Sequence, residues 1–254
     1  MLKRIYKSLI TEKQRINNRL LFEKLTSVFY RGNKFSCNIC GKNFRKFKPI
    51  ISLDVREKEK CPFCGSLGRY RLLLFYLQNE TKIFTQKASL LHFAPEYGLR
   101  AIFKKTKTLT YINGDYNAAY ADEQIDITNI PYPDETFDYV ICSHVLEYVP
   151  DEFKAMQEIR RVLKPDGIAL IFSLIDWNCP HTCGIEKIEA ELKRLKLSSD
   201  YYSERLYGSD FADRLRKGGF QVEVIDYLAK FTKEMQRRYS LGTPDDATIF
   251  RCTK

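Results

Sequence analysis

The chain has 254 residues, of which 44% are hydrophobic and 29% are charged, and its formal net charge is +10. This apolar fraction can bury the core of one medium-sized domain with a small appendage. No apolar run approaches the ~18 residues that a membrane-spanning helix needs, which excludes such a span. The charged N-terminal residues lack the apolar run of a secretory signal, so we expect a cytoplasmic protein in which cysteines stay reduced.

The positive charge is concentrated near the N-terminus. Residues 1–75 hold eighteen Lys and Arg against five Asp and Glu, a net charge of +13, whereas residues 76–254 hold twenty-four against twenty-seven, a net charge of −3. Clustered cations raise the local concentration of anions. We therefore expect an anionic partner there: a phosphorylated or lipid-linked substrate, a membrane surface or RNA.

Residues 1–33 are expected to form a basic helical arm. Apolar residues recur at helical spacing among Lys and Arg between residues 2 and 29. We expect this apolar stripe to pack on the rest of the chain, with the basic side in solvent. Contact with a membrane surface, which would make the protein peripheral to a membrane, and contact with nucleic acid are the alternatives.

Two Cys-x-x-Cys pairs come next in the chain, separated by twenty residues. Two residues between paired cysteines let one turn present both sulfurs to one ion, and four thiolates suit tetrahedral Zn²⁺. Gly41 and Gly65 end the two pairs, and glycine can take the positive φ that such a turn needs. Redox-active or disulfide-bonded dithiols are the alternative. The predicted ligands of a structural zinc ion are Cys37, Cys40, Cys61 and Cys64.

A small zinc ribbon with a connecting helix is expected over residues 34–78. Phe44 and Phe47 lie among Lys and Arg between the cysteine pairs. Such rings can stack on bases or can pack the strands of a ribbon that has little core of its own. We favour packing. Residues 67–77 are predicted to form a buried helix that ties the ribbon to the larger C-terminal domain.

Residues 79–254 alternate strand-like and helix-like stretches, which predicts an α/β fold with a parallel sheet covered by helices. The expected strands are residues 88–93, 108–113, 136–143, 168–174, 221–227 and 247–252. The expected helices are residues 99–105, 152–163, 185–197 and 209–217.

Three segments of this region carry a family resemblance. They are D-x3-IPYPD-x2-FD at residues 126–138, SHVLEYV at 143–149 and EI-x-RVLKP-x-G at 158–167. This pattern resembles the class I S-adenosylmethionine-dependent methyltransferases, specifically the type 11 group, over roughly residues 88–175. Together with CPFCGSLGRYRLL and HFAPEYGLR, the cysteine pairs resemble a bacterial subgroup of zinc-ribbon methyltransferases. The resemblance implies a Rossmann-like, mostly parallel sheet with an antiparallel closing strand, N-terminal helices and a small zinc ribbon.

The resemblance also implies a site for S-adenosylmethionine across the carboxyl ends of the first strands. Asp115 would accept hydrogen bonds from the ribose hydroxyls, Asp126 would meet the adenine amine, and Ile127 would cover a face of that ring. Ser143 and His144 would line the methyl-transfer chamber. The implied cofactor-binding residues of this part are Asp115, Tyr116, Asp126, Ile127, Ser143 and His144.

The first loop departs from the family pattern of an acid followed by glycines. His92 stands where an acid is often found, Ala94 and Glu96 stand at glycine positions, and Gly98 retains its glycine. We expect cofactor binding to be retained, with these four residues forming the loop. Glu96 is a candidate partner for the cofactor's ammonium group, and a decayed site is the alternative.

A general base is needed only if the acceptor must lose a proton. His144 and His181 are the candidates, and for each the alternative is a ring that only lines the pocket. His181 lies between Cys179 and Cys183, which we interpret as free thiols in a loop over the mouth of the site rather than as a second metal cluster.

Three functions remain open. The first is methylation of a hydroxyl or amine on a small metabolite, sugar or lipid-linked glycan. The second is methylation of an RNA base with help from the ribbon; the chain has neither an Asn/Asp-Pro-Pro-aromatic motif nor a Pro-Cys nucleophile, which leaves ring-nitrogen chemistry. The third is a non-catalytic binding protein on the same fold. The acceptor and the oligomeric state are not indicated.

Overall fold

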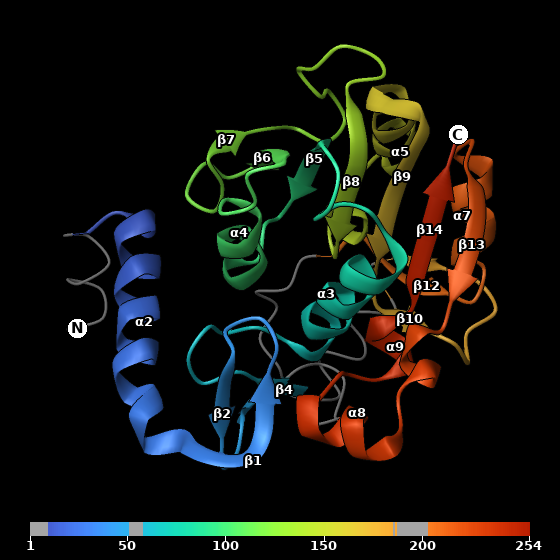
Figure 1. Ribbon diagram of the computed structural model, residues 1–254. Coiled ribbons are helices and arrows are strands. Elements are labelled where there is room, and N and C mark those ends of the chain that lie inside the picture. Colours follow the sequence, from blue (N-terminus) through green and yellow to red (C-terminus); the bar gives the residue numbers. More distant parts are fainter. Residues whose placement is uncertain (1–9, 51–57, 185, 187–202) are drawn as a thin grey trace.

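The computed structural model describes residues 10–50, 58–184, 186 and 203–254. Its centre is a seven-stranded sheet with helices on both faces (Figure 1), in the order β13-β14-β9-β8-β5-β6-β7. β14 pairs antiparallel with β13 and with β9, and the other neighbouring strands of this sheet pair in parallel. The expected Rossmann-like sheet with an antiparallel closing strand is confirmed. Its strands are β5 (Ala88–Phe93), β6 (Leu109–Asp115), β7 (Glu123–Gln124), β8 (Phe137–Ser143), β9 (Leu163–Phe172), β13 (Gln221–Ile225) and β14 (Ile249–Thr253).

Two apolar clusters lie on opposite faces of this sheet. Along β8, Val140 belongs to one cluster and Ile141 to the other, which is the two-residue alternation of a strand buried on both sides. The first cluster includes residues of α5 (Glu152–Val162) and α7 (Phe211–Lys217). The second includes residues of α3 (Gly68–Glu80) and α4 (Tyr97–Phe103). Both faces of the sheet are therefore covered, as its apolar strands require.

Several element boundaries differ by a few residues from the sequence expectation, and two of these differences have a clear local cause. β9 begins at Leu163, directly after α5, because Leu163 already pairs with Phe137 ahead of a register irregularity. α4 begins at Tyr97, since the Glu96 side chain caps it by accepting a hydrogen bond from the N–H of Leu99. Apart from residue 186, the helix expected over residues 185–197 lies outside the described residues. Smaller elements complete the chain: η2 (Leu146–Tyr148), β10 (Ile175–Asp176), β11 (Cys183–Gly184), β12 (Arg205–Gly208), η3 (Tyr227–Lys230), α8 (Lys233–Tyr239) and α9 (Pro244–Ala247).

The ribbon consists of two short antiparallel hairpins. They are formed by β1 (Arg31–Cys37) with β2 (Lys42–Phe44) and by β3 (Lys48–Ile50) with β4 (Lys58–Lys60). Phe44 and Phe47 are 1% and 3% exposed and pack in one cluster with Cys37 and Cys61. The packing interpretation of these rings is confirmed.

Arg71 ties the ribbon and α3 to the C-terminal part of the chain. Its side chain is fully buried, and its guanidinium donates to the carbonyl oxygens of Ser66, Tyr239 and Ser240 at 2.6 Å each. A buried guanidinium is stable only when its N–H groups find such acceptors. The ribbon is therefore fixed against the sheet domain.

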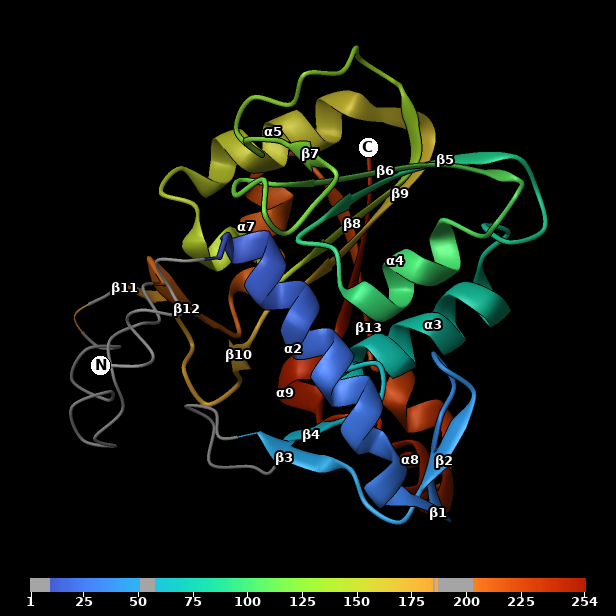
Figure 2. The ribbon, with the colours of Figure 1, turned by 90° about the vertical axis from the view of Figure 1, so that its left-hand side faces the viewer.

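Helix α2 (Glu12–Thr26), continued by η1 (Ser27–Tyr30), runs from the ribbon toward the segment that precedes β7 (Figure 2). Glu12 accepts hydrogen bonds from Asn117 and Tyr120, and Glu23 pairs with Lys60 at 2.6 Å. The expectation that the apolar stripe packs on the rest of the chain is wrong for α2, in which only Ile16 is buried. The side of α2 that carries Glu12 and Glu23 contacts the rest of the protein through the polar interactions of these two residues. Within the described residues, no helix combines the length and apolar character needed to cross a bilayer.

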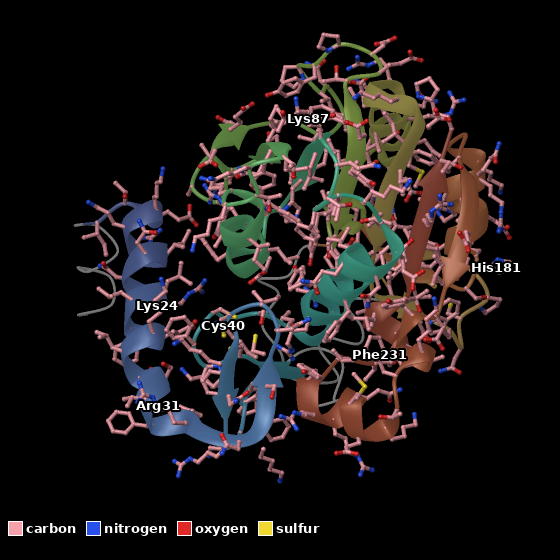
Figure 3. All side chains as sticks on the ribbon, in the orientation of Figure 1. Lys24, Arg31, Cys40, Lys87, His181 and Phe231 are labelled. Atoms are coloured by element: carbon pink, nitrogen blue, oxygen red, sulfur yellow. The ribbon has the colours of Figure 1, made fainter. Side chains whose placement is uncertain are left out.

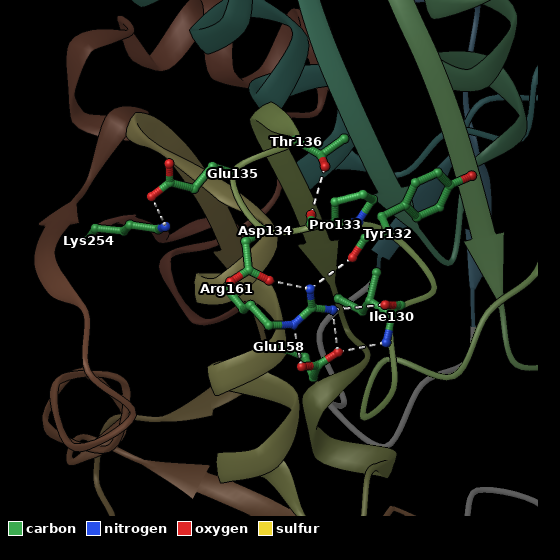
Figure 4. A network of polar contacts seen from close by, with 9 residues as sticks. All are labelled: Ile130, Tyr132, Pro133, Asp134, Glu135, Thr136, Glu158, Arg161 and Lys254. Carbon is green, nitrogen blue, oxygen red and sulfur yellow. Dashed lines mark hydrogen bonds and ion pairs between the residues drawn. The ribbon is translucent and has the colours of Figure 1, made fainter.

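Glu158 and Arg161, which belong to the segments that resemble the methyltransferases, have a structural role at the amino ends of the parallel strands, which we call the amino edge (Figure 4). Arg161 donates to Glu158, to Asp134 and to the carbonyl oxygens of Ile130 and Tyr132. Hydrogen bonds from Arg161 are the main reason that the pKa of Glu158 is lowered. This network anchors the loop that leads into β8, on the side of the sheet opposite the candidate site.

Candidate active site and metal centre

The carboxyl ends of β5, β6 and β8 form one level edge, which we call the carboxyl edge. Phe93 pairs with Gly114 of β6 and with Cys142 of β8. The residues that come next, Ala94, Asp115 and Ser143, therefore leave three adjacent parallel strands at the same height. The chain order reverses between β5 and β8, and such a switch point is where open α/β sheets bind ligands.

Asp115 is half-buried at this edge. One of its carboxylate oxygens accepts the N–H of Asn117 at 2.8 Å, and among the described residues no other group donates to it. Burial raises the pKa of Asp115, while that hydrogen bond lowers it. Tyr97 lies close enough for Asp115 to contribute to its raised pKa, although burial is the larger cause. The second carboxylate oxygen is thus available to accept hydrogen bonds from a ligand.

The first loop has an unusual backbone for its sequence. Ala94 has a φ of 47°, a left-handed conformation that glycine takes readily and that costs other residues roughly 1–2 kcal/mol. The chain thus takes a conformation typical of glycine at Ala94, where the resemblance implies a glycine. Burial raises the pKa of Glu96 to about 7, whereas the N–H groups of Leu99 and Gly98 lower it. The Glu96 carboxylate is already engaged as the cap of α4.

Gly98 brings the ribbon against this loop. A Cβ atom built at Gly98 would lie 2.5 Å from Cγ2 of Ile39, the residue just before Cys40 in the first cysteine pair. Only glycine permits so close an approach. Asn38, beside Ile39, donates to the carbonyl oxygen of Arg71 at 2.8 Å. The first turn of α4 and the first cysteine pair therefore form one packed unit.

His144 and Glu147 form a pair just beyond β8. The Nδ1 atom of His144 lies 2.9 Å from Oε1 of Glu147, and both side chains are largely buried. His144 has a φ of 54°, a strained conformation for a non-glycine residue, and its N–H donates to the carbonyl oxygen of Phe172. Arg205 donates to the carbonyl oxygens of Leu146 and Val149, which holds the turn. The sequence-based assignment did not include Glu147; its spacing of three residues after His144 was the available signal.

The remaining predicted site residues differ in burial: one is enclosed and two are exposed. His92 has no exposed surface, and its ring lies among Phe103 and Tyr111 beneath α4, so it does not reach the carboxyl edge. Tyr116 is 76% exposed. Asp126 is exposed and accepts hydrogen bonds from the N–H and hydroxyl of Thr128.

Ile127 and His181 differ in burial. Ile127 is buried in the first apolar cluster. His181 is exposed, in the segment between β10 and β11 and on the side of the molecule opposite Cys40 (Figure 3). This segment packs its backbone on Gly208, where a Cβ atom would lie 2.5 Å from the carbonyl oxygen of Cys179. The structure thus brings Ala94, Asp115, Ser143 and the residue after it to one edge, and leaves His92 and His181 outside it.

The four predicted zinc ligands meet in the ribbon. All four sulfur atoms lie within 4.8 Å of one another, with 3.6 Å between Cys37 and Cys64 and 3.8 Å between Cys40 and Cys61. Four sulfurs at about 2.3 Å from a tetrahedral Zn²⁺ are separated by about 3.8 Å. The donor set therefore fits zinc.

The surroundings of the cluster also suit a metal. Gly41 and Gly65 have φ of 69° and 75°, and their N–H groups donate to the carbonyl oxygens of Cys37 and Cys61. Hydrogen bonds from the other thiols, Cys40 first, lower the pKa of Cys37. The hydrogen bond with Cys37 is the first cause that raises the pKa of each of the other three thiols, Cys40, Cys61 and Cys64. A metal ion would displace the thiol protons, so its binding should release protons.

Comparison with known proteins gives a family match over part of the chain. Residues 101–171 match a family model described as a methyltransferase domain, and this match begins after the first loop. Over 102 residues the chain is 32% identical to "Probable methyltransferase ltbC" of Aspergillus luteorubrus, covering 38% of this chain and 36% of that protein. Over 68 residues it is 34% identical to "Uncharacterized methyltransferase YcgJ" of Bacillus subtilis, covering 27% and 26%.

A shorter match and a solved structure complete the comparison. Over 45 residues the chain is 44% identical to "Demethylmenaquinone methyltransferase" of Staphylococcus epidermidis, covering 18% of this chain and 19% of that protein. The crystal structure of Bacillus subtilis YcgJ is 15% identical, covers 72% of this chain and 97% of its own, and has a TM-score of 0.46. The chain thus spans about a third or less of the length of these three relatives.

Proposed function

Because the chain contains a class I methyltransferase domain, we propose that it moves the methyl group of S-adenosylmethionine to a hydroxyl or amine of a small metabolite, a sugar or a lipid-linked glycan. The observation that carries this proposal is the carboxyl edge, where Ala94, Asp115 and Ser143 lie at the ends of three adjacent parallel strands at one height. The bound sulfonium would supply an activated methyl group. The protein would then act mainly by aligning the acceptor with it.

Asp115 is the residue best suited to hold the ribose. It is half-buried and has a carboxylate oxygen available, so it can accept two hydroxyl hydrogen bonds in a partly dehydrated setting. Ala94 and Gly98 would let the backbone approach the methionine part of the cofactor, with Glu96 holding the turn in place through its cap. Asp126 and Ser143 remain proposed contacts to the adenine and to the chamber. We leave His92 out of this set because it is enclosed beneath α4.

His144 is the proposed general base for a hydroxyl acceptor. Its Nδ1 would donate to the Glu147 carboxylate, which fixes the tautomer in which Nε2 can accept a proton. The acceptor proton would pass to Nε2, and the carboxylate would stabilise the imidazolium that results. Glu147 acts here as a positioning residue. An amine acceptor that arrives unprotonated would not need this step.

We propose that the four ribbon cysteines hold a structural Zn²⁺. All four positions of a tetrahedral ion would be filled by protein sulfur, which leaves no open position for water or substrate. The hydroxyl of Ser66 lies 3.4 Å from the sulfur of Cys37 and 3.2 Å from that of Cys64, where it can hydrogen-bond to bound thiolates.

The two other functions are less well supported. Methylation of an RNA base by a ribbon that stacks on nucleotides is disfavoured because Phe44 and Phe47 are buried in the ribbon itself. A non-catalytic role would follow if the strained first loop no longer bound cofactor. For the proposed enzyme, the basic N-terminal segment is expected to meet an anionic partner or substrate, and the cytoplasm is its expected location.

Calorimetric titration with S-adenosylmethionine tests the cofactor site. We expect saturable binding by the wild-type protein and its loss in Asp115→Ala, with unchanged thermal unfolding. Asp213→Ala is the matched control, because Asp213 is an exposed carboxylate of α7 whose ion pair within the described residues is with its helix neighbour Arg216. Wild-type affinity in Asp115→Ala, or no binding by the wild type, would overturn the proposed site.

The acceptor can be found with methyl-labelled cofactor and fractionated cell extract. The proposal expects label in metabolites, sugars or lipid-linked glycans that depends on Asp115. Label that enters RNA instead would favour the base-methylating alternative. Cofactor binding without any labelled fraction would favour the non-catalytic role.

A further inference from the structure

Helix α2 and η1 turn an apolar face to solvent. Five large apolar side chains recur there. The last four follow Leu21 by one, four, seven and eight residues, which places all five on one side of a helix. The opposite side holds Glu12, Ile16 and Glu23, which contact the rest of the protein. We call the exposed set the α2 apolar face: Leu21 (57% exposed), Phe22 (66%), Leu25 (65%), Val28 (46%) and Phe29 (71%).

Exposed cations lie in the same part of the chain as this face. Residues 10–50 contain ten Lys and Arg against two Glu, a net charge of +8. Both acids are already engaged, Glu12 with Asn117 and Tyr120 and Glu23 with Lys60. Figure 3 shows Lys24 on α2 and Arg31 just beyond η1, and both side chains are exposed. Lys24 and Arg31 therefore lie beside the α2 apolar face.

We propose that the α2 apolar face inserts into the surface of an anionic lipid bilayer. A bilayer offers both things that this surface lacks: an apolar region for five side chains and a layer of negative charge for the cations around them. A second copy of the chain would bring the same +8 against itself. Nucleic acid would neutralise the cations but would leave the aliphatic side chains in water.

Helix α2 connects the docking surface with the carboxyl edge, because the apolar residues lie in its last turns and in η1, whereas its first turn contacts the segment after Asp115. The first turn of α2 holds Asn117 and Tyr120, which follow Asp115 in the segment before β7. A lipid-linked acceptor would therefore have to extend along α2 to reach the site. This consequence rests on the proposed methyltransferase function, whereas binding to the bilayer does not.

Co-sedimentation with vesicles tests the docking surface with the full chain. Phosphatidylcholine vesicles with and without phosphatidylglycerol would be compared at low and high salt. We expect binding to the anionic vesicles to be at least about tenfold tighter than to the neutral ones, and to weaken as salt rises. Phe22→Ser with Phe29→Ser, and separately Lys24→Glu with Arg31→Glu, should each weaken binding by about tenfold or more.

Val224→Ser is the matched control, because Val224 is 44% exposed on β13, outside this surface. It should bind vesicles as the wild type does, and all variants should keep the wild-type unfolding temperature. No binding by the folded wild type, or equal binding by the Phe22/Phe29 variant, would overturn the proposal. A dimer that dissociates in that variant without any vesicle binding would assign the face to a second copy. Calorimetric binding of S-adenosylmethionine, measured separately, distinguishes failure here from failure of the proposed enzyme.

Discussion

Gly98 is the position where the ribbon and the first loop can be tested together. A Cβ atom at Gly98 would lie 2.5 Å from Cγ2 of Ile39, about 1 Å closer than two carbon atoms normally approach. Overpacking of this kind costs roughly 1–3 kcal/mol, while alanine gains about 1 kcal/mol over glycine within a helix. We therefore expect Gly98→Ala to lower the free energy of unfolding by about 1 kcal/mol and to weaken cofactor binding.

Ile39→Ala removes the atom that a new Cβ would meet. The single change should cost about 1–2 kcal/mol, because Ile39 is only half-buried. In the double variant the added methyl group occupies the space of the removed one, so the two costs should not add. We expect a coupling free energy of about 1–2 kcal/mol, measured by urea unfolding of zinc-loaded protein.

A second glycine serves as the control for the contact between Gly98 and Ile39. Gly184→Ala introduces a methyl group with no atom within 4 Å, so its effect should add to that of Ile39→Ala. Additive free energies for Gly98→Ala with Ile39→Ala, or a Gly98→Ala variant more stable than the wild type, would show that the ribbon does not press on the first turn of α4.

Three further changes test other parts of the molecule. Cys61→Ser should lose bound zinc, measured by release to a chelating dye, and expose the ribbon to protease, whereas Cys179→Ser should keep both properties. Burial lowers the pKa of His92 from 6.5 to about 3, so the unfolded chain binds a proton between these values that the folded chain does not. Stability should therefore fall as pH drops from 6.5 toward 3, by up to about 1.4 kcal/mol per pH unit; His92→Phe should flatten this slope in urea unfolding at several pH values. For a hydroxyl acceptor, His144→Asn should reduce the transfer of labelled methyl groups by about 100-fold or more, and Glu147→Gln should reduce it by less. Cofactor affinity, measured by calorimetry, should stay unchanged in both variants. Loss of cofactor affinity in either variant would point to a structural role.

Local patterns in the sequence determined the sheet and the cluster of four cysteines. Each Cys-x-x-Cys-Gly unit holds its own turn, because the glycine at its end supplies a positive φ without any distant contact. Strand and helix periodicity likewise reflects the geometry of each element alone. The quoted segments that resemble the methyltransferases include Glu158 and Arg161, which proved to anchor a loop at the amino edge. Glu158 and Arg161 therefore indicated the fold, although they do not belong to the candidate site.

Tertiary packing decided which of these side chains can act. The two-residue alternation of β5 shows that His92 and Phe93 point to opposite faces, but only the position of α4 shows that His92 is enclosed. The helical spacing of α2 predicts an apolar side, yet polar contacts of Glu12 and Glu23 turn that side outward. The contact of Ile39 with Gly98 and the pairing of β5 with β8 join residues far apart in the chain. Such contacts depend on how elements pack, which no single element's sequence specifies.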